Sequence, residues 1–229
     1  MSDREIAVRA ERVRLSGGDR RVYPATTFEI PAGSVAAFLG ASGTGKTSLL
    51  LTIAGRMRGW HGCVEVDGVD AARHSARVRG LVGMGVMAGV NDLAEALTPA
   101  QHVTEAHVFV PRLKRSVYRD VLAEVGLDAA AHMQVKRLDA EQRIRLGIAL
   151  AIVRDVRVIV VDDLDRDLNQ EERTRVLALL HKLAEDGLTV LFACVDEATA
   201  SHADIVIPVE DVEPVSPISS RGVRTHAVA

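Results

Sequence analysis

The sequence predicts an α/β protein with a parallel core sheet, an N-terminal antiparallel β subdomain and an inserted helical subdomain. Two units predict the core: a strand, a glycine-rich loop and a helix over residues 35–54, then a strand, a helix and a strand over 156–193. Between them, the apolar spacing over 91–153 is helical. With 229 residues the chain is long enough to bury one such core, so we expect residues 1–229 to form a single domain.

Alternating apolar and polar residues precede the glycine-rich loop. Residues 6–30 alternate around the turn at residues 16–19, which reads Ser-Gly-Gly-Asp and predicts antiparallel strands. Beyond the first helix, residues 62–68 show the alternation of another strand that ends in a turn. We therefore expect a small antiparallel sheet beside the core.

The glycine-rich loop joins the apolar run 35–39, which is typical of a buried strand, to a helix over residues 47–54. Glycines let backbone N–H groups approach phosphates, Lys46 supplies a charge for the β- and γ-phosphates, and the Thr47 hydroxyl can bind Mg²⁺. The positive N-terminal end of the helix would face the same phosphates. The alternative is a strand-to-helix turn with an incidental lysine. The predicted nucleotide-binding residues are Gly40, Ala41, Ser42, Gly43, Thr44, Gly45, Lys46, Thr47 and Ser48.

The segment 91–153 predicts the helical insertion. Apolar residues share helical faces in two groups before Gly126 closes the segment. The first group is Leu93, Ala96 and Leu97, and the second is Val117, Val121, Leu122 and Val125.

The last part of the chain predicts the remainder of the sheet. Residues 156–161 and 188–193 are apolar runs of strand length with a helix over 170–185 between them, which predicts parallel strands. A final strand is expected at 205–207, and residues 214–229 are expected to form a flexible tail.

Asp162 follows the apolar run that ends at Val161. A carboxylate at this end of a nucleotide-binding sheet can hold Mg²⁺ through its water shell, together with Thr47. The alternative is that Asp162 and Asp163 only cap the turn or helix that follows.

Composition disfavours several other classes of protein. The net charge of −3 and an aromatic content of 3% argue against a nucleic-acid partner. Cys63 and Cys194 are isolated, which favours reduced thiols, and His102 and His107 are five apart, which disfavours a shared metal. No run of about 18 apolar residues predicts a membrane span or an export signal.

The order of these parts resembles that of the ATP-binding cassette (ABC) ATPases, the nucleotide-binding subunits of ABC transporters, from about residue 6 to residue 209. The resemblance implies ATP and Mg²⁺ as cofactors, and as partners a separate transmembrane protein and a second cassette, identical or different. It also implies a cytoplasmic position on the inner face of the cell membrane. The segments that carry it, besides the loop and Asp162, are 26–33, 66–68, 97–98, 125–127 and 142–151.

The segment 138–142 reads Leu-Asp-Ala-Glu-Gln where the family has the Leu-Ser-Gly-Gly-Gln signature that faces the partner's ATP. Asp139 and Glu141 are expected to bring negative charge toward a polyanion and to oppose closure of two cassettes. The alternative is a small loop shift that turns both carboxylates away.

Other catalytic parts of the family also differ here. The catalytic glutamate corresponds to Asp163, which is one methylene shorter, and the switch histidine corresponds to Val195. No glutamine occurs at residues 87–90, Tyr23 is too close to the loop to stack on adenine, and Asn169 replaces a customary aspartate.

Because the phosphate loop and Asp162 keep the family pattern, we expect Mg·ATP binding with slow hydrolysis, Asp163 being the candidate catalytic residue. The alternative within the same fold is a regulatory module that binds nucleotide without hydrolysing it. A small-molecule kinase would share the loop, but it does not predict residues 142–151 ahead of the Asp162 strand.

Overall fold

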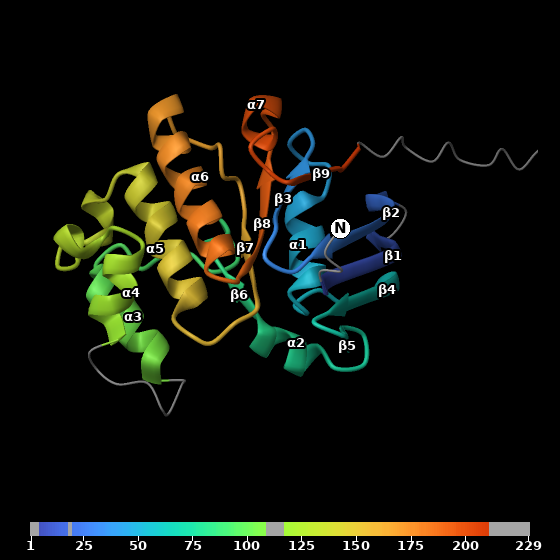
Figure 1. Ribbon diagram of the computed structural model, residues 1–229, viewed down its shortest axis with the longest axis horizontal. Coiled ribbons are helices and arrows are strands. Elements are labelled where there is room, and N and C mark those ends of the chain that lie inside the picture. The colour runs from blue at the N-terminus through green and yellow to red at the C-terminus, as the bar shows by residue number, and fades with distance from the viewer. Residues whose placement is uncertain (1–4, 18–19, 109–116, 211–229) are drawn as a thin grey trace, which may run out of the picture.

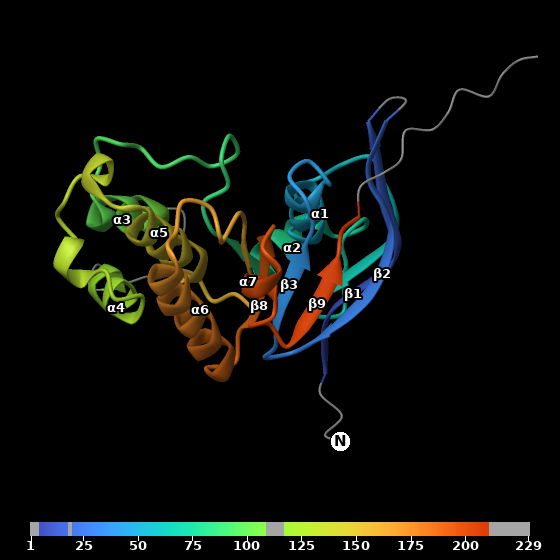
Figure 2. The same ribbon diagram turned by 90° about the horizontal axis from the view of Figure 1, so that it is seen from above.

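Two β-sheets with one helix between them form one side of the molecule, and the remaining large helices gather on the other side (Figures 1 and 2). The computed structural model describes residues 5–17, 20–108 and 117–210. The expected tail, 214–229, lies outside the described residues.

The smaller sheet is antiparallel and confirms the prediction for the N-terminal region. Its strand order is β2-β1-β4-β5, and β1 pairs with both β2 and β4. A turn at Asp67 and Gly68 joins β4 to β5, which is the expected hairpin. The strands are β1 (Ile6–Gly17), β2 (Arg20–Pro31), β4 (Trp60–Val66) and β5 (Val69–Asp70).

The larger sheet is parallel, with the strand order β6-β7-β8-β3-β9. Strand β3 lies between β8 and β9, so it is an inner strand of the sheet. The loop that follows β3 lies at the carboxyl ends of the strands, where ligands of open α/β sheets bind. The strands are β3 (Val35–Leu39), β6 (Val82–Met84), β7 (Val158–Val161), β8 (Thr189–Cys194) and β9 (Ile205–Pro208).

Each face of the parallel sheet packs into a different core, because successive side chains of a strand point to opposite faces. Val35 and Ala37 of β3 join the core under the large helices, whereas Ala36 and Phe38 join the core shared with the antiparallel sheet. Helix α1 (Lys46–Ile53) fills the space between the two sheets (Figure 1). Most of strand β3 and of helix α1 is thereby buried.

The large helices form a separate layer beside the parallel sheet (Figure 2). Helices α3, α4 and α5 contact one another, and α5 and α6 contact the sheet, α5 through β6 and β7 and α6 through β8 and β3. The bounds of α6 match the prediction. The helices are α3 (Pro99–Val108), α4 (Val117–Glu124), α5 (Ala140–Ile152) and α6 (Gln170–Glu185).

The prediction of a helical face at Leu93, Ala96 and Leu97 is wrong, because α3 begins only at Pro99. Thr98 marks this start. Its N–H donates to Gln101 Oε1 (2.9 Å) and its Oγ1 accepts from the Gln101 N–H (3.3 Å), which is the reciprocal pattern of a capping box. Proline at the first helical position supports the same boundary.

There are two short helices, α2 (Ser75–Leu81), which contacts β5 and β6, and α7 (Glu197–Ala200), which contacts β3 and β8. Across the described residues, no helix is both long and apolar enough to cross a bilayer.

Candidate functional site

The phosphate loop, residues 40–48, runs from the end of β3 to the start of α1. Gly43 and Gly45 both have a φ of 90°, a left-handed backbone conformation that residues other than glycine rarely adopt. Gly45 is also packed from behind, since an added Cβ would overlap the carbonyl oxygen of Val22 in β2. The glycines therefore set the shape of this loop and let it lie directly against the antiparallel sheet.

Lys46 folds back over the loop. Its Nζ donates to the carbonyl oxygens of Gly40 (2.7 Å) and Ala41 (2.9 Å), and the residue is only 5% exposed. The ammonium group is thus held inside the curve of the loop, where a phosphate group bound by the backbone amides would meet it.

Thr47 and Asp162 come together although they are far apart in the sequence. Thr47 Oγ1 donates to Asp162 Oδ2 (2.6 Å), which joins the first turn of α1 to the end of β7. Burial raises the pKa of Asp162, and its hydrogen bond with Thr47 and the nearby charge of Lys46 oppose that rise.

The Asp162 side chain retains an oxygen for a ligand. Oδ1 is buried and has no hydrogen-bond partner among the described residues. A buried carboxylate oxygen without a partner is costly unless a cation or water satisfies it. One carboxylate and one hydroxyl, completed by waters and phosphate oxygens, is a ligand set that Mg²⁺ accepts, so these residues fit the metal.

A cleft of about 660 Å³ opens above the loop, and we call it the phosphate cleft. The side of the cleft opposite the loop includes Asp163, Asp165, Arg166 and Val195. The remaining lining residues are Val22, Ser42, Gly43, Gly45, Lys46, Thr47 and Ser48.

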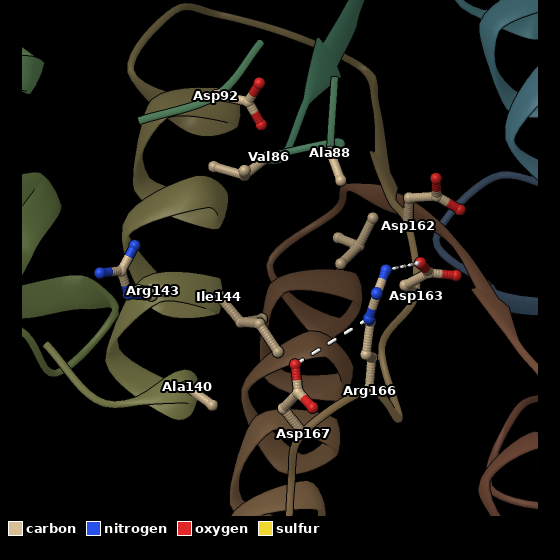
Figure 3. A pocket seen from close by; sticks show the side chains of 11 residues that line it. Val86, Ala88, Asp92, Ala140, Arg143, Ile144, Asp162, Asp163, Arg166 and Asp167 are labelled. Carbon is tan, nitrogen blue, oxygen red and sulfur yellow. Dashed lines mark hydrogen bonds and ion pairs between the residues drawn. The ribbon is translucent and has the colours of Figure 1, made fainter. Parts of the chain in front are cut away.

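Asp163, the predicted catalytic residue, lies at the rim of the phosphate cleft. Its φ is 46°, and its side chain is 45% exposed. Its Oδ2 accepts from Arg166 Nη1 (3.2 Å), and Figure 3 shows the two side chains pointing toward one another. The Asp163 carboxylate is therefore bound within an ion pair.

The segment after β8 presents an apolar side chain to the cleft. Val195 is 48% exposed, and its backbone N–H donates to Asp165 Oδ2 (2.8 Å). The same oxygen accepts from the Asp196 N–H (2.7 Å). Asp165 thus fixes the loop that carries Val195, a role that sequence reasoning missed because it depends on contacts across the sheet.

A second cavity, of about 210 Å³, lies between α5, the loop 85–92 and the segment after β7 (Figure 3). Val86 and Ala88 line it, Ala88 lying in the segment 87–90 where the family's glutamine is expected and none occurs, and Met87 is buried. Asn91 holds this loop closed, because its side chain accepts from the Met87 N–H (2.8 Å) and donates to the Gly85 carbonyl (2.9 Å).

Asp139 and Glu141 are expected to bring negative charge toward a facing nucleotide, which stays a prediction, and both make contacts within the chain. Asp139 caps α5, with its Oδ1 accepting from the Gln142 N–H (2.8 Å). Glu141 forms ion pairs with Arg145 (2.8 Å) on α5 and Arg175 (2.7 Å) on α6. These arginines, Arg175 foremost, lower the pKa of Glu141. Both carboxylates are thus engaged in contacts within the chain.

Tyr23 does not offer a stacking surface. The ring is fully buried, and its hydroxyl lies 2.8 Å from Thr52 Oγ1 of α1. Burial raises the pKa of Tyr23. This tyrosine therefore joins the antiparallel sheet to α1, in agreement with the prediction that it is not an adenine-stacking residue.

Comparisons with known proteins agree with this geometry. The chain is 30% identical over 204 residues to the thiamine import ATP-binding protein ThiQ of Brucella abortus, a match covering 87% of this chain and 83% of ThiQ. It superposes on CbiO1 of Clostridium perfringens, part of the ABC transporter complex CbiONQ, with a TM-score of 0.77 at 20% identity over 90% of this chain and 87% of CbiO1.

A second solved structure is an ATP-binding cassette dimer in a post-hydrolysis state with ADP and phosphate. It gives a TM-score of 0.76 at 22% identity and covers 90% of this chain and 97% of that cassette. These two structures share the fold, including both sheets and the helices beside them. The ABC transporter family model matches residues 24–165, more than half of the chain, and the chain belongs to this family of ATP-binding cassettes.

Proposed function

We propose that this chain is a transporter ATP-binding subunit that binds Mg·ATP through residues 40–48, with Thr47 and Asp162 as the metal-binding residues. The observation that carries the proposal is the contact between Thr47 and Asp162 beneath the loop, with one buried carboxylate oxygen left without a partner among the described residues. A loop that binds phosphates and a carboxylate that holds their metal are the two parts of a P-loop nucleotide site.

The subunit works, in this proposal, on the inner face of the cell membrane against a separate transmembrane protein. The family match and the role of ThiQ in thiamine import support such coupling. A second cassette, identical or different, is the other expected partner, and the dimeric relative supports that arrangement.

Hydrolysis is expected to be slow. Asp163 has a shorter side chain than the family's glutamate and is bound to Arg166, so it is poorly placed to polarise the attacking water. Val195 cannot donate a hydrogen bond to the γ-phosphate, and the segment 87–90, whose Ala88 lines the second cavity, contains no glutamine.

The second candidate function is a regulatory module in which bound nucleotide stabilises a shape that another protein recognises, without turnover. The ion pair that occupies Asp163 favours this alternative. Binding without phosphate release would select it over the ATPase.

Calorimetric titration with ATP, with and without Mg²⁺, tests nucleotide binding, and phosphate release then measures turnover. We expect Mg²⁺-dependent binding and a low rate of release. Absence of binding by the wild-type chain would overturn the proposal. Asp163→Asn separates the two candidates, because it should alter cellular function only if hydrolysis is needed.

A further inference from the structure

Arg166 lies at the junction of the two cavities. It lines the phosphate cleft together with Lys46 and Val195, and it also lines the second cavity (Figure 3). Its side chain is 65% exposed and is therefore accessible to a ligand. Within the described residues, no other arginine lines the phosphate cleft.

A tight turn holds this arginine beside Asp163. The Arg166 backbone N–H donates to the Asp163 carbonyl (3.1 Å), and its Nη1 donates to the Asp163 carboxylate. In the described part of the chain, the bond to the Asp163 carboxylate is the only hydrogen bond of the Arg166 guanidinium. The Asp167 Oδ2 atom lies 3.9 Å from Arg166 Nε. A guanidinium has five N–H donors, so most of them remain to bind an anion.

The charges around the phosphate cleft indicate that a bound phosphate would need the Arg166 guanidinium. Lys46 already donates to its own loop, and Asp163 and Asp165 bring two carboxylates near a polyanionic ligand. Val195, on the same side of the cleft, offers no donor from its side chain. The planar fork of an arginine fits phosphate oxygens in a bidentate manner, which a valine or an occupied lysine cannot do.

We propose that Arg166 binds the terminal phosphate of the nucleotide and so makes the site distinguish nucleoside triphosphates from diphosphates. The inference rests on the proposed nucleotide binding. The contact would also draw the Arg166 guanidinium away from Asp163 and so break their ion pair. Binding of the triphosphate would therefore release the Asp163 carboxylate.

Arg166→Ala tests the contact. Calorimetry with Mg·ADP and with a non-hydrolysable Mg·ATP analogue should show that the preference for triphosphate falls about tenfold or more, as for a lost charge-assisted hydrogen bond, while ADP affinity stays within about twofold. Arg166→Lys should lose less, because it keeps the charge without the fork. The matched control is Arg77→Ala, an exposed arginine of α2 outside both cavities, which should leave the preference unchanged.

A double variant separates direct contact from simple neutralisation of Asp163. If Arg166 binds phosphate, Asp163→Asn combined with Arg166→Ala should still show the reduced preference. If the double variant regains the wild-type preference, or if Arg166→Ala never loses it, the inference is overturned. A wild-type chain that binds neither nucleotide would instead overturn the proposed function. Arg166→Gln keeps the Cβ–Cγ–Cδ stem without the charge and repeats the test should the alanine variant melt early.

Discussion

Lys46 is buried, and the phosphate loop depends on its side chain. Its ammonium group binds two carbonyls of its own loop, so its loss would remove both a charge and the internal support of that loop. We expect Lys46→Ala to abolish measurable Mg·ATP binding and to eliminate the rise in melting temperature that a bound ligand causes.

Thermal melting with and without Mg·ATP checks this expectation. Lys182→Ala, an exposed lysine of α6, is the matched control and should keep the shift. A Lys46→Ala protein that is still stabilised by Mg·ATP would show that the loop does not bind through this lysine.

Cys194 illustrates the opposite case, a reactive side chain made inert by its position. It ends β8 beside β3 and is fully buried, and burial raises its pKa to about 12. At pH 8 the thiol is therefore protonated and a poor nucleophile. Peptide mass mapping after brief iodoacetamide treatment should show no label on Cys194 in the native protein and labelling of both cysteines after unfolding. Rapid native labelling of Cys194 would contradict this prediction.

At the scale of elements, Glu141 joins two helices. Its ion pairs with Arg145 and Arg175 link the start of α5 to α6, and we name this group the Glu141 clasp. Glu141→Gln should reduce the free energy of unfolding by about 1 kcal/mol at pH 7, a modest figure because Arg175 is half exposed and water screens the pair. Urea denaturation measures the change.

The Glu141 clasp also has a defined pH dependence. The pKa of Glu141 is lowered from 4.5 in the folded protein, so its contribution is present above that value and is lost as the pH falls through the folded pKa. The difference between wild type and Glu141→Gln should therefore shrink as the pH falls below 4.5 and vanish once the pH is below the folded pKa. Glu171→Gln, at a nearly fully exposed carboxylate 4.0 Å from Arg175, is the control and should change stability little. A difference that persists in acid would assign the loss to packing.

The elements differ in how far the sequence predicts them. The bounds of β3 and α6 follow from local pattern, β3 from an apolar run before glycine and α6 from Asn169, whose side chain accepts from the Glu172 N–H (3.0 Å). The apolar spacing of residues 93–97 predicts a helix that begins before α3 does, whereas Thr98, Pro99 and Gln101 carry the capping signal of its true start.

The features of the candidate site also differ in how far the sequence predicts them. The phosphate loop could be predicted because its residues are contiguous, and the approach of Asp162 to Thr47 follows from the topology of a parallel sheet. The ion pair of Asp163 with Arg166 and the pairing of Glu141 with Arg175 depend on side-chain directions, which spacing alone does not determine.

At the scale of the whole molecule, slow turnover is the expected property that distinguishes this cassette. The phosphate cleft combines a family-like loop with Asp163 and Val195 on the opposite side. Restoring the family residues with Asp163→Glu and Val195→His should raise phosphate release by about 10- to 100-fold, because a correctly placed base and a γ-phosphate donor return together. Release is measured in the presence of the transmembrane partner.

Two outcomes would contradict that expectation. The first is a wild-type rate that already equals that of an intact cassette. The second is a double variant that folds and binds Mg·ATP but gains no rate, which would favour the regulatory module. Val206→His, at an exposed position on β9 outside the phosphate cleft, controls for the added histidine.

The close packing of Gly45 against Val22 has a mechanical consequence. There is no room for even a methyl group between the loop and the strand behind it. Because the loop and the strand are in direct contact there, we expect a tilt of the antiparallel sheet to press on the phosphate loop at Gly45. The outer sheet and the phosphate loop are therefore expected to move together.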